Sequence, residues 1–250
     1  MKSNFILISG FATNSFELKH LISFLNRFVS LHFIDLPGFS KQVPPLKKIS
    51  LDNYVAYVND QIKKLNLDEY WLGGLSFGFL LANHVRKSKK CKGIFAIEPY
   101  LNINEVKESF LNKITDLIVI KFIHTFKLYK WFWYSPYFKK LLTKNNLAGR
   151  VTRMLRTMDA RSFFEVAWIL LTNKEPIKFK KKPPILLINE NDELVCANEE
   201  EAYFKKKIKE LLIVHTSASH VPKRMPSEKY FEKHVGLNNM KKIIKFTKQF

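Results

Sequence analysis

The residue types best suited to chemistry in this chain are one serine, one histidine and two acids, each in a short polar or glycine-rich segment. Ser76 lies between two glycines in LGGLSFGF. A serine hydroxyl is a weak nucleophile and needs a neighbouring base, which His220 in SASHVP could supply. That base needs an orienting carboxylate, for which Asp192 and Glu190 in NENDELV compete. These groups predict nucleophilic attack on a carbonyl carbon.

The segments that must position these residues alternate between short apolar runs and amphipathic stretches. Such alternation with short connections predicts an α/β protein, with a mostly parallel sheet covered by helices on both faces. Ser50 is the expected N-cap of one of these helices. The predicted strands are residues 4–9, 31–35, 69–74, 92–99, 185–190 and 210–215, and the predicted helices are residues 15–28, 51–65, 77–88, 197–209 and 237–250.

The alternation stops for a long stretch in the middle of the chain. Residues 100–175 are helical in pattern and rich in aromatic side chains, and the basic run KFKKKPP follows them. The sequence therefore predicts a core formed by residues 1–100 and 181–250. Residues 101–180 are expected to form a helical insertion.

The predicted parallel sheet would bring the reactive groups together, since ligands bind beyond the carboxyl ends of such strands. Ser76 follows one strand and precedes a helix, as an exposed nucleophile requires. Asp192, in a turn beyond its strand, is favoured over Glu190, which lies closer to the strand end. His220 follows the last strand. Asp35 lies near the same edge, but its DLPG context is typical of a capped turn.

An oxyanion that forms at this site would need at least two hydrogen-bond donors. The backbone N–H of Phe77, directly after the serine, is the first candidate. The second should come from the loop after the first strand, which makes the N–H of Phe11 our prediction.

Composition limits the possible partners. The chain has 250 residues and a net charge of +20, with 42 Lys and Arg against 22 Asp and Glu. This charge favours anionic partners such as an acidic protein or an anionic membrane surface, but no nucleic-acid motif accompanies it. The two cysteines have no metal-binding or disulfide spacing, and no metal or cofactor is expected. No signal peptide or membrane span is recognisable, which predicts a cytoplasmic protein.

Five segments in order give the chain a resemblance to the α/β-hydrolase superfamily. They are SGF (9–11), DLPGFS (35–40), GLSFG (74–78), NENDELV (189–195) and SHVP (219–222). The order serine, acid, histidine along the chain is the one that this superfamily uses. Within it, the first hundred residues look most like the pimeloyl-[acyl-carrier protein] methyl ester esterases of biotin synthesis.

This resemblance implies that the insertion, residues 101–180, forms a lid over the acyl pocket, and it implies roles for individual residues. Ser76 would be the nucleophile, His220 the base and Asp192 the orienting acid, while the amides of Phe11 and Phe77 would form the oxyanion hole. Phe11 and Phe77, together with a lid phenylalanine at Phe122, would contact the substrate. Four lid arginines would grip an acidic acyl carrier protein and its phosphopantetheine arm: Arg150, Arg153, Arg156 and Arg161.

The predicted function is that of a serine carboxylesterase working through an acyl-enzyme. The expected substrate is pimeloyl-[acyl-carrier protein] methyl ester. Alternatives are a lipase, an acylglycerol esterase or an acyl thioesterase whose aromatic and basic lid contacts membrane lipid. A protein of a different class, an inactive hydrolase fold that only binds a partner, is a further alternative.

Overall fold

The structure is a computed structural model of the chain. It describes residues 2–100, 110–144, 156–173, 184–189, 192, 197–208, 210–218 and 225–250. For residues 110–113, 141–144 and 200 it describes the backbone only.

Six strands form one sheet in the order β2-β1-β3-β4-β5-β6, and every neighbouring pair is parallel. The predicted parallel sheet is therefore confirmed. Apolar side chains alternate between its two faces, and β3 and β5 are buried along their whole length, as expected when helices cover both faces. The strands are β1 (Asn4–Ile8), β2 (Ser30–Ile34), β3 (Tyr70–Leu75), β4 (Cys91–Ile97), β5 (Pro184–Asn189) and β6 (Leu212–Thr216).

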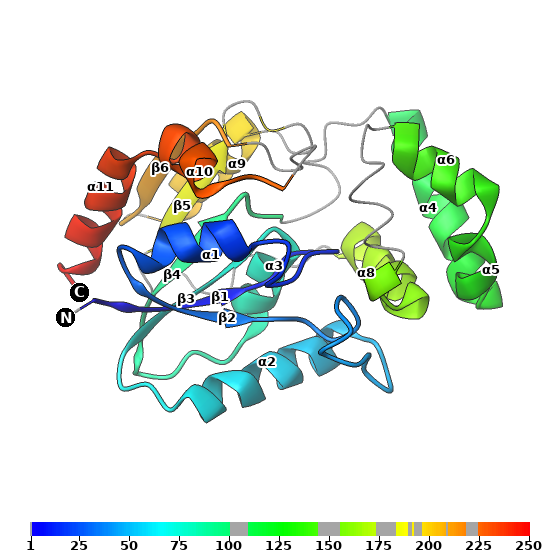
Figure 1. The fold of residues 1–250 in the computed structure, drawn as a ribbon, viewed down its shortest axis with the longest axis horizontal. Coiled ribbons are helices and arrows are strands. Elements are labelled where there is room, and N and C mark those ends of the chain that lie inside the picture. Colours follow the sequence, from blue (N-terminus) through cyan, green and yellow to red (C-terminus); the bar gives the residue numbers. More distant parts are fainter. Residues whose placement is uncertain are drawn as a thin grey trace.

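Helices cover both faces of this sheet (Figure 1). One face packs against α1 (Lys19–Asn26), α10 (Glu228–His234) and α11 (Leu237–Thr247). The other packs against α2 (Leu51–Leu65), α3 (Phe77–His84) and α9 (Ala197–Lys207).

Local sequence explains where several of these helices begin and end. Ser50 caps α2 as predicted, because its hydroxyl accepts a hydrogen bond from the N–H of Asn53 at 3.2 Å. The predicted helix 77–88 is too long, since the backbone turns extended at Val85 and α3 ends at His84. Helix α10 was not predicted, although Ser227 caps it in the same way as Ser50 caps α2.

Between β4 and β5 the described chain is helical, as predicted for this region. We call α4 (Phe110–Phe126), α5 (Tyr129–Trp133), α6 (Pro136–Lys144) and α8 (Ala160–Thr172) the inserted helices. Helix α8 lies next to the sheet, and α4, α5 and α6 lie beyond it at one end of the molecule (Figure 1). Aromatic side chains from α5, α6 and α8 pack together, among them Trp133, Phe138 and Phe163.

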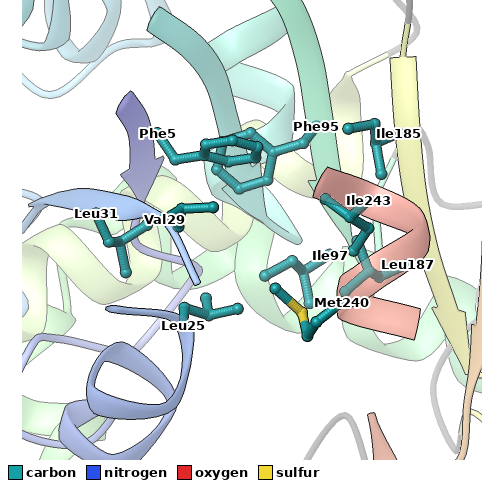
Figure 2. Close-up of a pocket in the computed structure, with 10 residues that line it drawn as sticks. All are labelled: Phe5, Leu25, Val29, Leu31, Phe95, Ile97, Ile185, Leu187, Met240 and Ile243. Atoms are coloured by element: carbon teal, nitrogen blue, oxygen red, sulfur yellow. The ribbon is translucent and has the colours of Figure 1, made fainter. Parts of the chain in front are cut away.

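A small cavity of about 20 Å³ lies between the sheet and α1 and α11. Figure 2 shows that its lining is entirely apolar, with Phe5 and Phe95 from the sheet facing Met240 and Ile243 from α11. A water molecule would find no polar partner there, so this space is a packing defect of the core. It is too small to hold a substrate.

Candidate active site

Ser76 occupies the sharp turn between β3 and α3. Its backbone has φ 48° and ψ −111°, a conformation that costs a non-glycine residue about 1–3 kcal/mol. The turn is anchored to the neighbouring strand, since the Ser76 N–H donates a hydrogen bond to the carbonyl of Ile97 at 3.0 Å. The side chain of Ser76 is partly exposed, while Leu75 and Phe77 on either side of it are buried. The turn therefore presents the serine hydroxyl at the carboxyl edge of the sheet.

The two glycines of the motif are required by close backbone contacts. A Cβ atom on Gly74 would lie 2.1 Å from the carbonyl carbon of Gly78. A Cβ atom on Gly78 would lie 2.3 Å from the carbonyl oxygen of Ile8 in β1. Both distances are far below van der Waals contact, so no other residue fits at either position without backbone movement. The glycines thus let α3 start directly against β1 and β3.

Backbone strain is concentrated at this edge of the sheet. Among the described residues, five non-glycine residues have positive φ. Three of them, Ala12, Ser76 and Glu98, lie in the segments that directly follow β1, β3 and β4. Residues held in sparsely populated conformations cluster at functional sites, because the surrounding structure must hold them there. The clustering supports this edge as the functional one.

The two predicted oxyanion-hole residues lie in adjacent segments. Phe77 is the first residue of α3, and the first N–H groups of a helix have no acceptor within the helix. Phe11 follows Gly10, where a Cβ atom would lie 3.0 Å from the carbonyl oxygen of Leu75. The loop after β1 therefore runs directly against the turn that carries Ser76. This arrangement can place two backbone donors near one oxyanion.

Aromatic contacts hold these two segments in place. The ring of Phe11 packs edge-on against Phe39, which stacks on Tyr54, and Tyr54 in turn packs edge-on against Phe77. Phe11 also contacts Phe163 of α8, with ring centroids 4.8 Å apart. Helix α8 thus contributes an apolar side chain beside the loop next to Ser76.

The predicted orienting acid, Asp192, is buried just beyond the carboxyl end of β5. Its N–H donates a hydrogen bond to the carbonyl of Asn189, the last residue of β5, at 3.1 Å. Glu190 and His220 lie outside the described residues, so the predicted contacts of a triad remain predictions. Asp35 was expected to cap the turn of its own DLPG segment, but its carboxylate instead accepts hydrogen bonds from the N–H and the hydroxyl of Ser15, in the loop before α1.

A second buried carboxylate at this edge, Glu98, was not predicted from the sequence. It directly follows Ile97, the residue whose carbonyl accepts the hydrogen bond from Ser76, and its own N–H donates to Leu187 at 2.9 Å. Its φ of 46° is as unusual as that of Ser76. The available signal was its position at the end of a predicted strand, in the segment KGIFAIEP.

Two substitutions separate the roles of these acids. We expect Asp192→Asn to lower kcat for ester hydrolysis by about 10³-fold, because an asparagine cannot stabilise the imidazolium that forms in the reaction. We expect Glu98→Gln to lower kcat by less than about tenfold. Steady-state kinetics with a short p-nitrophenyl ester would measure both. The opposite ranking would assign the orienting role to Glu98.

The structure places two of the predicted lid arginines. Arg161 donates hydrogen bonds to the carbonyl oxygens of Leu46 at 2.8 Å and Lys47 at 2.6 Å, so it fastens α8 to the loop before α2. Arg156 is exposed. Arg150 and Arg153 lie outside the described residues.

The predicted substrate contact Phe122 lies on the exposed side of α4. Its ring packs against Phe126, with centroids 4.8 Å apart, and more than half of its side-chain surface is open to solvent. The structure therefore brings Phe11 and Phe77 to the turn that carries Ser76, and it puts Phe122 on the outer surface of the inserted helices.

Tyr54 lies where α8 meets the loop that follows β2. Its hydroxyl donates a hydrogen bond to the carbonyl of Pro37 at 2.9 Å, and the carbonyl of Gly38 accepts one from the N–H of Asp159, the N-cap residue of α8. Burial raises the pKa of Tyr54 well above its usual value, the neighbouring Asp159 raises it further, and a hydrogen bond with Ser162 opposes the shift. The folded protein therefore strongly favours the neutral phenol.

This raised pKa predicts a loss of stability at alkaline pH. The stabilisation is complete below the unfolded-state pKa of about 10 and declines as the pH rises above it, because only the unfolded chain then releases the proton. We expect the free energy of unfolding of Tyr54→Phe to fall less steeply between pH 10 and 11 than that of the parent protein. Urea unfolding at several pH values would measure this. Parallel slopes for the two proteins would contradict the prediction.

Other features of the described chain lie elsewhere. A basic groove of about 530 Å³ lies at the opposite, amino edge of the sheet, between Asn59 of α2 and Lys90 before β4. Within the described residues, no cluster of three or more His, Cys, Asp or Glu side chains could hold a metal ion. Among the helices that the structure describes, none is long and apolar enough to cross a membrane.

Solved structures resemble this chain over its whole length at low sequence identity. A hydrolase from Oleispira antarctica superposes with a TM-score of 0.70 and 15% identity, covering 100% of this chain and 92% of its own. A carboxylesterase from the thaumarchaeon Nitrososphaera gargenis gives a TM-score of 0.68 and 13% identity, with the same coverage. An α/β-hydrolase from a deep-sea metagenome gives 0.66 and 13% identity, covering 100% of this chain and 90% of that one.

No protein-family model and no curated protein sequence matches the chain. The resemblance to solved structures, at identities of 13 to 15%, concerns the fold. Together with the parallel sheet and the serine turn after β3, it establishes that the chain has the α/β-hydrolase fold.

Proposed function

We propose that this protein is a serine hydrolase that cleaves carboxylic esters through an acyl-enzyme. The observation that carries the proposal is the conformation of Ser76, a partly exposed serine held at positive φ between β3 and α3. Gly74 and Gly78 lie where neighbouring backbone atoms leave no room for a Cβ atom. A protein that only bound a partner would have no need to maintain this strained turn. The buried acids Asp192 and Glu98 at the same edge support the proposal.

The reaction would follow from the chemistry of these groups. The Ser76 oxygen attacks the ester carbonyl carbon while His220 takes the hydroxyl proton. The backbone N–H groups of Phe11 and Phe77 stabilise the oxyanion. The bond to the alkoxy group then breaks, and His220 returns the proton to the departing alcohol. Water, activated by the same histidine, releases the acid and restores the serine.

The experiment that tests this proposal combines turnover with covalent labelling. Purified protein should hydrolyse short p-nitrophenyl esters, and a fluorophosphonate probe should form an adduct that peptide mass spectrometry locates on Ser76. Prior heat denaturation should abolish labelling, since only the folded turn activates the serine. Absence of both turnover and labelling would favour the alternative of an inactive fold that binds a partner.

For the substrate, our first candidate is pimeloyl-[acyl-carrier protein] methyl ester, the substrate of the esterases that the first hundred residues resemble. The net charge of +20 suits an acidic carrier protein. Arg156 is exposed and could contribute to such binding, whereas Arg161 already donates to two backbone carbonyls. The carrier site would then depend on Arg156 and on the arginines outside the described residues.

A second candidate substrate, a lipid ester, is favoured by a specific observation. The inserted helices expose several large apolar side chains, including Phe122 and Trp131, which a soluble carrier protein would not require. Supplying the carrier-bound methyl ester and a dispersed acylglycerol side by side would decide between the two. Cleavage of the acylglycerol alone would exclude the biotin pathway.

A further inference from the structure

The exposed apolar surface of this protein is concentrated on three of the inserted helices. Seven of the eleven large apolar side chains that are exposed among the described residues belong to α4, α5 or α6, and an eighth, Tyr134, lies between α5 and α6. Single exposed apolar residues are ordinary on a soluble protein, but a contiguous group marks a surface that meets another apolar phase. The eight are Ile114, Leu117, Ile118, Phe122, Phe126, Trp131, Tyr134 and Tyr137.

Helix α4 is apolar on two opposite sides. On one side Ile123 is buried, with Val119 and Ile120 packed against the core. On the other, an outer stripe made of Ile114, Ile118, Phe122 and Phe126 repeats every four residues, a spacing that puts side chains on one helix face. Ile118 and Phe126 are each 61% exposed. Packing within the chain accounts for the first side and leaves the outer stripe facing solvent.

The next two helices add exposed aromatic side chains to this surface. Trp131 of α5 is 70% exposed, and Tyr134 and Tyr137 are also open to solvent. Phe132 connects them, because its ring contacts both Trp131 and Tyr137. Tryptophan and tyrosine are the residues enriched where a protein meets the boundary between membrane and water.

The charge on the same segment is strongly positive. Residues 110–144 contain seven lysines and a single acidic residue, Asp116. Five of these lysines are exposed: Lys121, Lys127, Lys130, Lys139 and Lys140. Lysine can lay its alkyl chain along an apolar surface while its ammonium group reaches a phosphate, so this mixture suits an anionic lipid better than an acidic protein. An acidic protein would neutralise the lysines but would leave Ile118, Phe122 and Phe126 without an apolar environment.

We propose that the outer surface of α4, α5 and α6 docks on anionic phospholipid bilayers. The outer stripe and Trp131 enter the interfacial region of the bilayer, and the surrounding lysines contact lipid phosphates. The proposed contact is peripheral, with the helices lying along the interface rather than crossing it. This docking goes beyond the proposed esterase activity and does not depend on it.

The docked surface lies at the end of the molecule that carries the candidate active site. Helix α4 packs against α8, through stacking of His124 on Trp168, and α8 reaches the loop next to Ser76 through the contact of Phe163 with Phe11. In Figure 1 the strands run toward α8, and α4, α5 and α6 lie on its far side. Docking would therefore bring the lipid surface to the same end as the serine.

Vesicle binding tests the proposal without any substrate. The parent protein should co-sediment, in 0.15 M salt, with vesicles of phosphatidylcholine and phosphatidylglycerol (3:1) at least about tenfold more tightly than with phosphatidylcholine alone. Tryptophan emission should shift to shorter wavelength on binding, and Trp131→Phe should remove most of that shift. Of the other three tryptophans, Trp71 and Trp133 are already buried, and Trp168 is only partly exposed and stacks on His124. Failure to bind anionic vesicles would overturn the proposal.

Matched variants then identify the surface. Phe122→Ser combined with Phe126→Ser should weaken binding by about tenfold or more, whereas Phe16→Ser, equally exposed beside α1, should leave it unchanged. Lys121→Glu should weaken binding more than Lys63→Glu, which alters an exposed lysine of α2.

Equal effects of the apolar variants and their control would overturn the proposal. The proposal would also be overturned if the parent protein did not bind vesicles but bound a purified acyl carrier protein tightly, and if the outer-stripe variants lost that binding. Thermal unfolding would verify that each variant is folded.

Discussion

Replacing Ser76 by alanine should lower kcat for short p-nitrophenyl esters by about 10³-fold or more. The reason is that the substitution removes the nucleophile that the turn after β3 presents, while water attack assisted by the predicted oxyanion hole would supply the small residual rate. Steady-state kinetics and the disappearance of fluorophosphonate labelling would measure the loss. Retention of more than a tenth of the activity would show that the reaction does not use Ser76.

Two controls make the Ser76→Ala result specific. Alanine at φ 48° is as strained as serine, so the midpoint of thermal unfolding should change little and a loss of activity cannot be attributed to unfolding. Ser88→Ala removes a hydroxyl at the opposite edge of the sheet, next to Tyr70, and should keep full activity. A comparable loss in Ser88→Ala would point to a general defect of the preparation.

Replacing Gly78 by alanine should lower the free energy of unfolding by about 3 kcal/mol or more and abolish activity. The added Cβ atom would lie 2.3 Å from the carbonyl oxygen of Ile8 and 2.5 Å from that of Ser9, and these backbone atoms can move only if β1 and α3 separate. Helix propensity alone predicts the opposite sign, because alanine is favoured over glycine in a helix by about 1 kcal/mol. Urea unfolding would measure the difference.

Gly236→Ala is the matched control for Gly78→Ala. No atom lies within 4 Å of a Cβ at Gly236, but φ is +84°, so the substitution costs only backbone strain of about 1–2 kcal/mol. Gly78→Ala should therefore destabilise the protein more than Gly236→Ala does. If Gly78→Ala proved neutral, the close approach of α3 to β1 would be wrong, and with it the geometry of the Ser76 turn.

Much of the fold could be predicted from local pattern. The apolar runs at residues 4–9 and 69–74 and the capped helix from Ser50 appear where the pattern placed them, because each depends on neighbours within a few residues. The first helix is shorter than predicted. It starts at Lys19, since hydrogen bonds hold the preceding residues in turns: the N–H of Ser15 donates to Asp35, which is distant in sequence, and the N–H of Glu17 donates to nearby Asn14.

The candidate site was predictable to the extent that its geometry is local. The strand–serine–helix turn is encoded within LGGLSFGF, and the two oxyanion-hole candidates lie close to strand ends, Phe77 two residues after β3 and Phe11 three residues after β1. Glu98 escaped prediction, because nothing in its local sequence reports that it is buried or that its φ is positive. Its burial depends on the pairing of β4 with β5, because the N–H of Glu98 donates a hydrogen bond to the carbonyl of Leu187 in β5.

The amino-acid sequence by itself determined the parallel α/β architecture and the position of Ser76 in a strained turn, since periodicity and glycine spacing act over short distances. Only the tertiary structure decided how the inserted helices are used. Helix α4 has apolar side chains on two sides, so its pattern cannot tell which side is buried, and packing against α8 selected Ile123 and left Phe122 exposed. In the same way, Arg161 was expected to contact the carrier protein, but it links α8 to the loop before α2. The fold brings the carbonyl groups of Leu46 and Lys47, which are distant in sequence, within hydrogen-bond distance of its guanidinium group.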